Sequence, residues 1–520
     1  MTRHSRLPIA VLVAATLAGT AACERGHRER DSRSARASES SPPADWAVRA
    51  RDPNPAVRRD VLWAIGGAGD RAITGLALLV AGLDDPDATV REQAAWAIGK
   101  LGHPAAQQAV PKLTALLADP EATVRERAAF ALGNMGDAAA SAEAALVEAL
   151  DDAATPVRLR AARALANIGT SSPAAVPILL EMTHDERPEV RRAATGSLGK
   201  TGAVTPEVLP RLLELAEHDP DHTVRGAALG ALGELRGPAA KAAVPLLVAA
   251  LGGPSVEARI SAANALGKIG PPEAASAVPA LVAALTAPER DLQRATATAL
   301  GRFGAAAEPA VPALTKLVKS SDGKVREGAV HALGLIGPGA SSAVGVLVEA
   351  LASDDLTVHW RVATALGRIG SPSIQPLEGV LADGDAQKAT LAAFALGKVG
   401  PPAARSIQPL VRALDRPELS VRQTAVRAIG LIGGPEARAA VPRLIELLDD
   451  PDRATRKFTA IALGDLGAIS PEIRPALEEH ADDPQGDVRA AVQNALARLA
   501  HPQGTAVAEP ADDAEGGPRS

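Results

Sequence analysis

The sequence predicts an all-α protein, a right-handed α-solenoid (superhelix) of about fourteen stacked helical hairpins. The first observation is a motif that returns every 33 or 34 residues: Val-Arg, then small apolar residues, then Leu-Gly-x-x-Gly. One copy runs from Val124-Arg125 through Leu132-Gly133 to Gly136. The second observation is that 47% of the residues are hydrophobic but only 2% are aromatic. This balance is unusual for a globular domain and typical of closely packed, alanine-rich helices.

Residues 1–22 predict a secretory signal, here of the lipoprotein type. Arg3, His4 and Arg6 are followed by an apolar run, residues 7–18, that is too short to span a bilayer as a stable helix. The residues before Cys23, the only cysteine, resemble a lipobox, although Thr stands where Leu is usual. We therefore expect a lipid on Cys23; the alternative is ordinary signal cleavage next to an incidental cysteine.

Two segments lack an apolar stripe and are predicted to be disordered. Residues 23–44 are rich in Arg, Ser and Pro and form the predicted tether, whose arginines either meet anionic lipid headgroups or belong to a simple spacer. Residues 501–520 form the predicted acidic tail. The repeat region between them covers residues 45–500.

Each repeat reads as two helices separated by a turn. Residues 109–118 carry apolar residues on one helical stripe, and residues 124–132 carry a second stripe. Asp119-Pro120 lies between them, because Pro cannot continue the first helix and Asp can cap the second. Gly133 and Gly136 are expected to end the second helix in the left-handed conformation. Neither stripe can be buried within one hairpin, so neighbouring hairpins must stack.

The position after Val defines a slot that fixes the register of the repeats. Three repeats keep the frame with Gln293, His359 and Ala389 in the slot, and eleven carry arginine there: Arg58, Arg91, Arg125, Arg158, Arg191, Arg225, Arg259, Arg326, Arg422, Arg456 and Arg489. The step from His359 to Ala389 is only 30 residues. We predict a local irregularity or hinge near residues 379–388.

The combination Ala-Val-Pro-x-Leu, Asp-Pro, Val-Arg and Ala-Leu-Gly-x-x-Gly resembles HEAT-like repeats of the phycobilin-lyase type. Val278-Pro279 and Val311-Pro312 match the first helix, and Asp450-Pro451 matches the turn. The resemblance implies that the slot arginines form a ladder with turn aspartates of neighbouring repeats, namely Asp85, Asp119, Asp219 and Asp450. It also implies that the second helices line the concave face.

The candidate binding residues lie on the side of the second helices opposite the core stripe. Four of the eight Trp and Phe residues occupy one position of the repeat, five residues after the slot: Trp63, Trp96, Phe130 and Phe394. Arg163 shares that position, and the position directly after the slot carries Glu92, Glu126, Arg192 and Trp360. Exposed aromatics flanked by arginine are typical anchors of a recognition surface. The alternative is that the rings pack sideways between adjacent second helices.

Catalytic chemistry has little support in the sequence. The HEAT-like enzyme deoxyhypusine hydroxylase uses His-Glu pairs to hold two irons, and none of the ten histidines here is followed by Glu. The weak candidate for a metal site is the set His184, His218 and His222, which falls at or near equivalent turns of adjacent repeats. The alternative is that these three histidines are exposed in the turns and bind no metal. No cofactor is expected.

The sequence favours a non-enzymatic scaffold that binds a protein or peptide partner. The net charge of −6, with 55 basic and 61 acidic residues, shows no basic excess of the kind expected for a nucleic-acid binder. The signal predicts export to a bacterial membrane, with a lipid anchor facing the periplasm or the exterior. Two alternatives stay open: a metal-binding or oxidoreductase/lyase-type HEAT-repeat enzyme, and a structural envelope spacer.

Overall fold

The computed structural model of the chain describes residues 44–500 with the exception of 103–105, 170–173, 202–205 and 352–355. Within these residues every regular element is helical, either α or short 3-10, and there is no strand. The prediction of an all-α solenoid is confirmed. The predicted signal, lipidation site, tether and tail lie outside the described residues, apart from Ala44, which begins the first helix.

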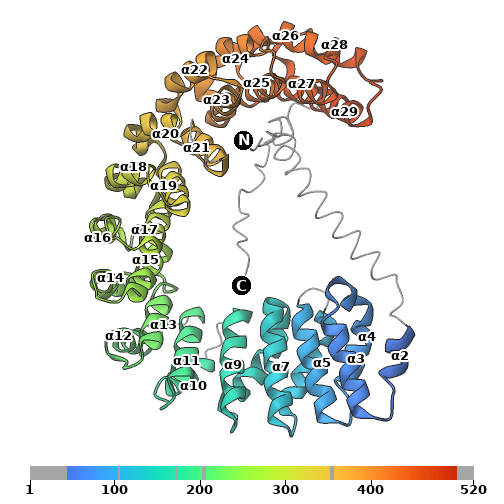
Figure 1. Cartoon of the computed structure of the whole chain (residues 1–520), viewed down its shortest axis with the longest axis vertical. Helices are drawn as coiled ribbons and strands as arrows, with labels where there is room; N and C mark the ends of the chain where they lie inside the picture. The colour runs from blue at the N-terminus through green and yellow to red at the C-terminus, as the bar shows by residue number, and fades with distance from the viewer. Residues whose placement is uncertain (1–43, 103–105, 170–173, 202–205, 352–355, 501–520) are drawn as a thin grey trace, which may run out of the picture. The chain divides into compact units, whose positions relative to one another are not determined.

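The helices alternate between two roles (Figure 1). The even-numbered helices are the first helices of each hairpin: α2 (Ala44–Arg49), α4 (Leu76–Gly82), α6 (Val110–Ala115), α8 (Glu143–Glu148), α10 (Ala175–Met182), α12 (Val208–His218), α14 (Gly237–Leu251), α16 (Val278–Ala284), α18 (Val311–Leu317), α20 (Val344–Ala350), α22 (Ile374–Asp383), α24 (Ile407–Ala413), α26 (Val441–Glu446) and α28 (Ile473–Glu479). The odd-numbered helices are the second helices: α3 (Pro55–Gly66), α5 (Ala88–Leu101), α7 (Ala122–Met135), α9 (Thr155–Ile168), α11 (Pro188–Lys200), α13 (His222–Leu232), α15 (Val256–Ile269), α17 (Arg290–Phe303), α19 (Gly323–Ile336), α21 (Leu356–Ile369), α23 (Ala386–Val399), α25 (Leu419–Ile432), α27 (Arg453–Leu466) and α29 (Gly486–Ala500).

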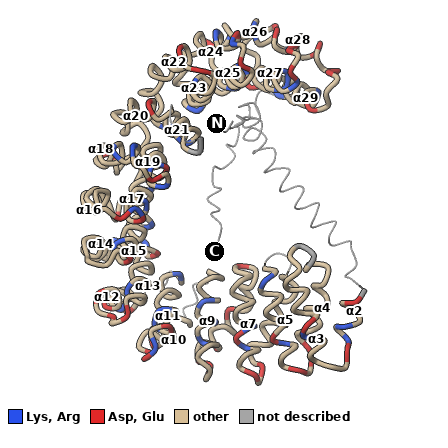
Figure 2. Tube along the Cα trace, in the orientation of Figure 1, with Lys and Arg blue, Asp and Glu red and all other residues tan. Residues whose placement is uncertain are grey.

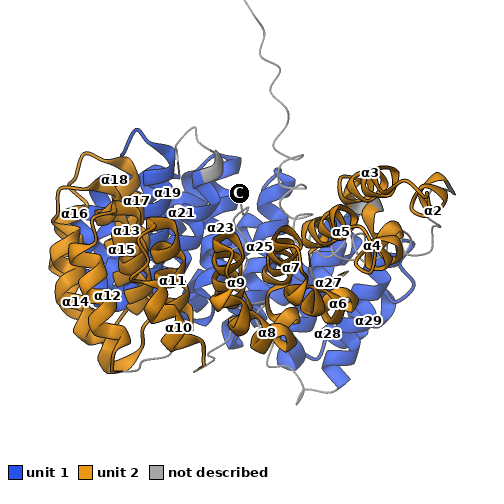
Figure 3. Cartoon of the chain, turned by 90° about the horizontal axis from the view of Figure 1, so that it is seen from below, with its two compact units in different colours: residues 1–15, 300–520 blue, residues 16–299 orange. Residues whose placement is uncertain are grey.

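The chain divides into two compact units inside α17. The described residues of one unit end at Ala299 and those of the other begin at Leu300 (Figure 3). Within each unit, second helices pack on second helices, as α5 does on α7 and α23 does on α25. First helices likewise contact first helices, as α12 does with α14 and α22 does with α24. In the unit that begins at Leu300, the second helices α19, α21, α23, α25 and α27 lie on the inner side of the curve, and the first helices lie outside them (Figure 1).

The core consists of aliphatic side chains between the two helix layers, and the closest contacts use glycine and alanine. Gly133 lies inside α7, where a Cβ would approach the Ala164 Cα of α9 to 2.9 Å. Of these two glycines, only Gly136 has a positive φ, at 58°. The expectation that both glycines end the helix in the left-handed conformation is therefore wrong for Gly133. The first glycine lets neighbouring second helices touch, and the second one turns the chain.

The expected arginine ladder is present. The guanidinium of Arg91 donates from Nε and Nη2 to the two carboxylate oxygens of Asp119 in the next turn, over 2.7 and 2.9 Å. Its Nη1 donates to the carbonyls of Asp85 and Pro86 in its own turn. Equivalent ion pairs between successive repeats are Arg58–Asp85, Arg125–Asp152, Arg158–Asp185, Arg191–Asp219, Arg422–Asp450 and Arg456–Asp483. Each such arginine joins two turns, so the ladder fixes the stacking register.

The ladder carboxylates should make the fold sensitive to acid. The Arg125 hydrogen bond lowers the pKa of Asp152, and a hydrogen bond from Arg187 lowers the pKa of Asp185 to about 2. Because these pKa values are lower in the folded chain than in the unfolded one, the stabilisation is present above about pH 4 and is lost as the pH falls toward 2. Urea unfolding followed by circular dichroism should give midpoints that fall between pH 5 and pH 2, and a constant midpoint would contradict this prediction.

The short step between His359 and Ala389 comes from a tight turn. Only Gly384 and Asp385 separate α22 from α23, and buried His359 hydrogen-bonds Gln387 where other repeats have the arginine pair. The predicted irregularity is therefore present. Helix α23 packs against both α21 and α25, and a hinge at this turn stays a prediction that hydrogen exchange can test.

One described segment is apolar and long enough to suggest a membrane span. It covers Gly323–Ala350, and 56% of its most apolar window is buried. The segment consists of α19 and α20 joined by a 3-10 turn, Gly337–Ala343. Its hydrophobicity is that of a repeat core.

Candidate binding face on the second helices

Three aromatic residues lie at one position of successive second helices. Trp63 on α3 is 62% exposed, whereas Trp96 on α5 and Phe130 on α7 are half-buried. A Cβ at Gly66 would lie 3.0 Å from the Trp96 ring, and one at Gly99 would lie 2.9 Å from the Phe130 ring. Each of these two rings thus rests on a glycine of the preceding second helix. Sideways packing therefore accounts for part of their area, and Trp63 presents the most open ring.

Cations cover the two half-buried rings. The guanidinium of Arg160 lies 5.2 Å from the centre of the Phe130 ring, and the Lys100 ammonium lies 5.9 Å from that of Trp96. Arg160 also forms an ion pair with Glu126 over 3.2 Å. The equivalent pair one repeat earlier is Arg127–Glu92, at 3.4 Å. Glu92 and Glu126 each form an ion pair with an arginine of the next second helix. Their carboxylates are therefore already engaged within the face.

Arg163 and Arg192 behave differently from the ladder arginines. Both are exposed, on α9 and α11, and neither has an acidic or hydrogen-bonding partner among residues 44–500 that the structure describes. Desolvation and then the positive charges of Arg160 and Arg192 lower the pKa of Arg163. We name Arg160, Arg163 and Arg192 the arginine cluster; blue segments mark basic residues on α9 and α11 in Figure 2. The cluster combines two unpaired guanidiniums with the ring of Phe130.

A second aromatic group lies in the unit that begins at Leu300. Trp360 on α21 and Phe394 on α23 meet edge to face, with ring centres 5.0 Å apart and an interplanar angle of 87°. Lys398 lies 6.0 Å from the Phe394 ring centre. The structure therefore brings together two candidate residues that occupy different positions of the repeat.

Sequence reasoning missed one stack of this kind. The guanidinium of Arg427 lies 5.2 Å from the ring centre of Phe458 in the next repeat. Arg427 stands five residues after its slot and Phe458 two residues after the next slot. Phe130 and Arg160 occupy the same two positions with the residue types exchanged. A search for a cation and a ring at these two positions would have found both stacks.

The repeat family follows from comparison with known proteins. A family model described as HEAT repeats matches eight overlapping ranges: residues 44–133, 110–199, 143–233, 219–283, 278–353, 311–397, 380–441 and 407–497. The chain belongs to the HEAT-repeat family. The match is to HEAT repeats in general, so the phycobilin-lyase type stays a prediction. No curated protein matches the chain.

Several solved structures share this fold at low sequence identity. Importin beta aligns with a TM-score of 0.54 and 16% identity, covering 87% of this chain and 73% of that one. The karyopherin Kap121p bound to the SUMO protease Ulp1p aligns with a TM-score of 0.58 and 13% identity, covering 88% and 60%. Kap95p, from a structure that concerns its binding to RanGDP, aligns with a TM-score of 0.52 and 16% identity. The alignment covers 87% of this chain and 71% of that one. These similarities establish the fold.

The HEAT-repeat stacking does not assemble the weak metal candidate. His184, His218 and His222 are exposed, and the described residues contain no group of three His, Cys, Asp or Glu side chains that could hold a metal ion. Arg211 chiefly, with smaller contributions from His184 and His218, lowers the pKa of Glu214. His222 instead acts on Asp221 and on Glu257 of the next repeat. The described residues therefore do not bring the three histidines together into a site that could hold a metal ion.

Proposed function

We propose that the chain is a non-enzymatic scaffold that binds a protein or peptide partner on the second helices α3 to α11. The observation that carries the proposal is the arginine cluster beside the row of Trp63, Trp96 and Phe130. Unpaired guanidiniums at a surface offer several N–H donors each without first breaking an internal ion pair. Exposed rings supply apolar area next to them, and Trp and Arg are enriched among residues that dominate binding energy.

The chemistry of the face defines the partner. Arg163 and Arg192 favour carboxylates, which they can bind through two parallel hydrogen bonds. Trp63 favours an apolar side chain beside those acids. We therefore expect a partner with acidic and apolar residues interleaved. The karyopherin Kap121p, whose solved structure shares this fold, is itself bound to another protein, the SUMO protease Ulp1p, so the fold is compatible with such a role.

A crosslinking pull-down from native envelopes tests this proposal. A Trp63→Ser, Trp96→Ser, Phe130→Ser variant and an Arg192→Glu variant should each lose a partner that the unchanged chain captures. Lys241→Glu is the matched control, because Lys241 is exposed on the first helix α14 of the same unit. Circular dichroism must show that all variants remain helical. Equal capture by every variant would place the site elsewhere, and no reproducible partner would favour the structural spacer.

We further propose that the chain is exported and anchored to a bacterial membrane by a lipid on Cys23. The support is the sequence alone: a basic start, a short apolar run and one cysteine at its end. Metabolic labelling with a fatty acid should label the unchanged chain, and Cys23→Ser should abolish the label and release the protein from membranes. Membrane association that survives Cys23→Ser would contradict the lipid anchor.

A further inference from the structure

A patch of apolar side chains around one arginine lies on the second helices α25 and α27, both in the unit that begins at Leu300. Leu431 and Ile461 are 56% and 36% exposed. Arg427 precedes Leu431 by four residues on α25, and Phe458 precedes Ile461 by three on α27, so each pair shares one helix face. The guanidinium of Arg427 lies 5.2 Å from the centre of the Phe458 ring and joins the two pairs. We call these four residues the Arg427 patch.

Arg427 is a positive charge without a counter-charge. Among the residues that the structure describes, it has no acidic or hydrogen-bonding partner. Asp465, whose Oδ2 would lie 3.6 Å from a Cβ at Gly430 of α25, instead forms an ion pair with Arg498. Desolvation lowers the pKa of Arg427. A ring on one face of a guanidinium leaves the N–H donors in its plane available, so the patch offers hydrogen-bond donors to a carboxylate.

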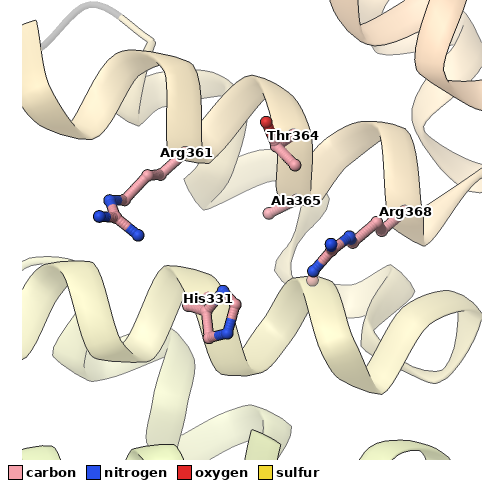
Figure 4. A pocket seen from close by; sticks show the side chains of 6 residues that line it. His331, Arg361, Thr364, Ala365 and Arg368 are labelled. Atoms are coloured by element: carbon pink, nitrogen blue, oxygen red, sulfur yellow. The ribbon is translucent and has the colours of Figure 1, made fainter. Parts of the chain in front are cut away.

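A small pocket between α19 and α21 of the same unit differs in this respect (Figure 4). Its volume is ≈ 160 Å³, and His331, Arg361 and Arg368 are among the residues that line it. His331 and Arg368 already have interaction partners, and Arg361 forms an ion pair with Glu327. These three side chains are therefore engaged, whereas Arg427 has a ring beside it and no acid.

We propose that the Arg427 patch binds residues 501–520 of the same chain. A carboxylate of this segment meets the Arg427 guanidinium, and Val507 covers the exposed apolar side chains beside it. The charges are complementary, because the segment has one arginine and four acids: Glu509, Asp512, Asp513 and Glu515. This inference rests on α25 and α27 and stands whether or not the α3–α11 face binds a partner.

Helices α25, α27 and α29 run side by side in the same direction. Along α25 the stack of Arg427 on Phe458 comes first and the contact of Gly430 with Ala462 comes second, and the order on α27 is the same. The glycine–alanine contact recurs at the matching position between α27 and α29. The end of α29 therefore lies at the same end of the stack as Leu431, which stands one residue before the end of α25.

Residues 501–520 follow directly on α29 and can therefore reach the patch. Neighbouring packed helices are about 8–10 Å apart, so the end of α29 is about 16–20 Å from that of α25. A chain spans up to about 3.3–3.6 Å per residue, and Val507 stands seven residues beyond Ala500. The acids begin two residues later, at Glu509. A short link of this kind gives an effective concentration on the order of millimolar, so weak contacts suffice.

Photo-crosslinking of the purified full chain tests the proposal. The photoreactive residue p-benzoylphenylalanine, placed at Ile461, should crosslink to residues 501–520 of the same chain with a yield that does not depend on protein concentration. The same residue placed at Gln408, which is exposed on the first helix α24, should give no such crosslink. Proteolysis and mass spectrometry identify the product. A product confined to crosslinked dimers would overturn the proposal in favour of a second copy on the patch.

Charge variants make the test sharper. Arg427→Glu should lower the crosslink yield roughly tenfold, because a charge-assisted hydrogen bond is lost. Arg427→Lys keeps the charge but loses the planar fork and should be intermediate. Arg412→Glu is the matched control, since Arg412 is exposed on the first helix α24 of the same unit, and it should crosslink as the unchanged chain does.

A variant with all four acids of residues 501–520 replaced by their amides leaves the solenoid itself unchanged. It should lower the crosslink yield as much as Arg427→Glu does, and it decides the question if circular dichroism shows that Arg427→Glu is not helical. No crosslink between position 461 and residues 501–520 would overturn the proposal. An unchanged yield in the amide variant, or equal yields from Arg427→Glu and Arg412→Glu, would overturn it as well.

Discussion

Replacing Asp152 with alanine is expected to lower the free energy of unfolding by about 3 kcal/mol. The carboxylate accepts from Nε and Nη2 of Arg125 over 2.6 and 2.9 Å and from the Ala154 amide over 2.7 Å. The side chains of Arg125 and Asp152 are only 16% and 10% exposed. Alanine leaves the guanidinium partly buried without its counter-charge, and an unpaired buried charge is among the costliest single defects.

Two further variants separate the parts of this effect. Asp152→Asn keeps one oxygen for the Ala154 amide and Arg125 Nη2 but loses the charge and the acceptor for Arg125 Nε, so its effect should be smaller than that of Asp152→Ala. Lys319→Ala breaks an ion pair with Glu349 whose side chains are 64% and 68% exposed, and it should change the free energy of unfolding by less than about 1 kcal/mol. Urea unfolding at pH 7 measures all three. An Asp152→Ala effect as small as that of Lys319→Ala would show that the ladder does not stabilise the stack.

Two glycines of helix α11 should respond in opposite directions to the same substitution. A Cβ at Gly199 would lie 2.5 Å from the Ala231 Cα and 2.6 Å from its Cβ in α13. Gly199→Ala must therefore push α11 and α13 apart, at a cost of about 1–3 kcal/mol. A Cβ at Gly196 would meet nothing within 4 Å, and Gly196 does not have positive φ. Gly196→Ala should stabilise the chain by up to about 1 kcal/mol, because alanine favours the helix.

Thermal unfolding followed by circular dichroism can measure this pair. The two variants have the same composition, so a difference in midpoint reports the packing at one glycine alone. Hydrogen exchange should also show faster exchange in α11 and α13 for Gly199→Ala, since each repeat is held mainly by its neighbours. Stabilisation by both substitutions would mean that the second helices can separate without cost.

The ladder was expected from the resemblance to HEAT-like repeats, and the shared period explains why it recurs along the chain. The slot arginine and the turn aspartate recur with the same period, so the next turn must come within reach of each arginine once hairpins stack. The same reasoning failed for Gly133, because a helix-ending glycine and a close-contact glycine look alike in sequence. The three candidate histidines form no metal site among the described residues, because exposed turn side chains do not converge merely by recurring near one another in the sequence.

The sequence by itself determined the hairpin, the register and the second-helix face, since these follow from a period that every repeat shares. The tertiary structure decided what happens between helices. It placed Arg160 on the ring of Phe130, left Arg163 and Arg192 without partners among the described residues, joined Trp360 to Phe394 and opened the pocket between α19 and α21. Those features depend on how close two neighbouring helices come and on which side chains meet there. Such distances are set by the volumes of individual residues, and these differ from one repeat to the next.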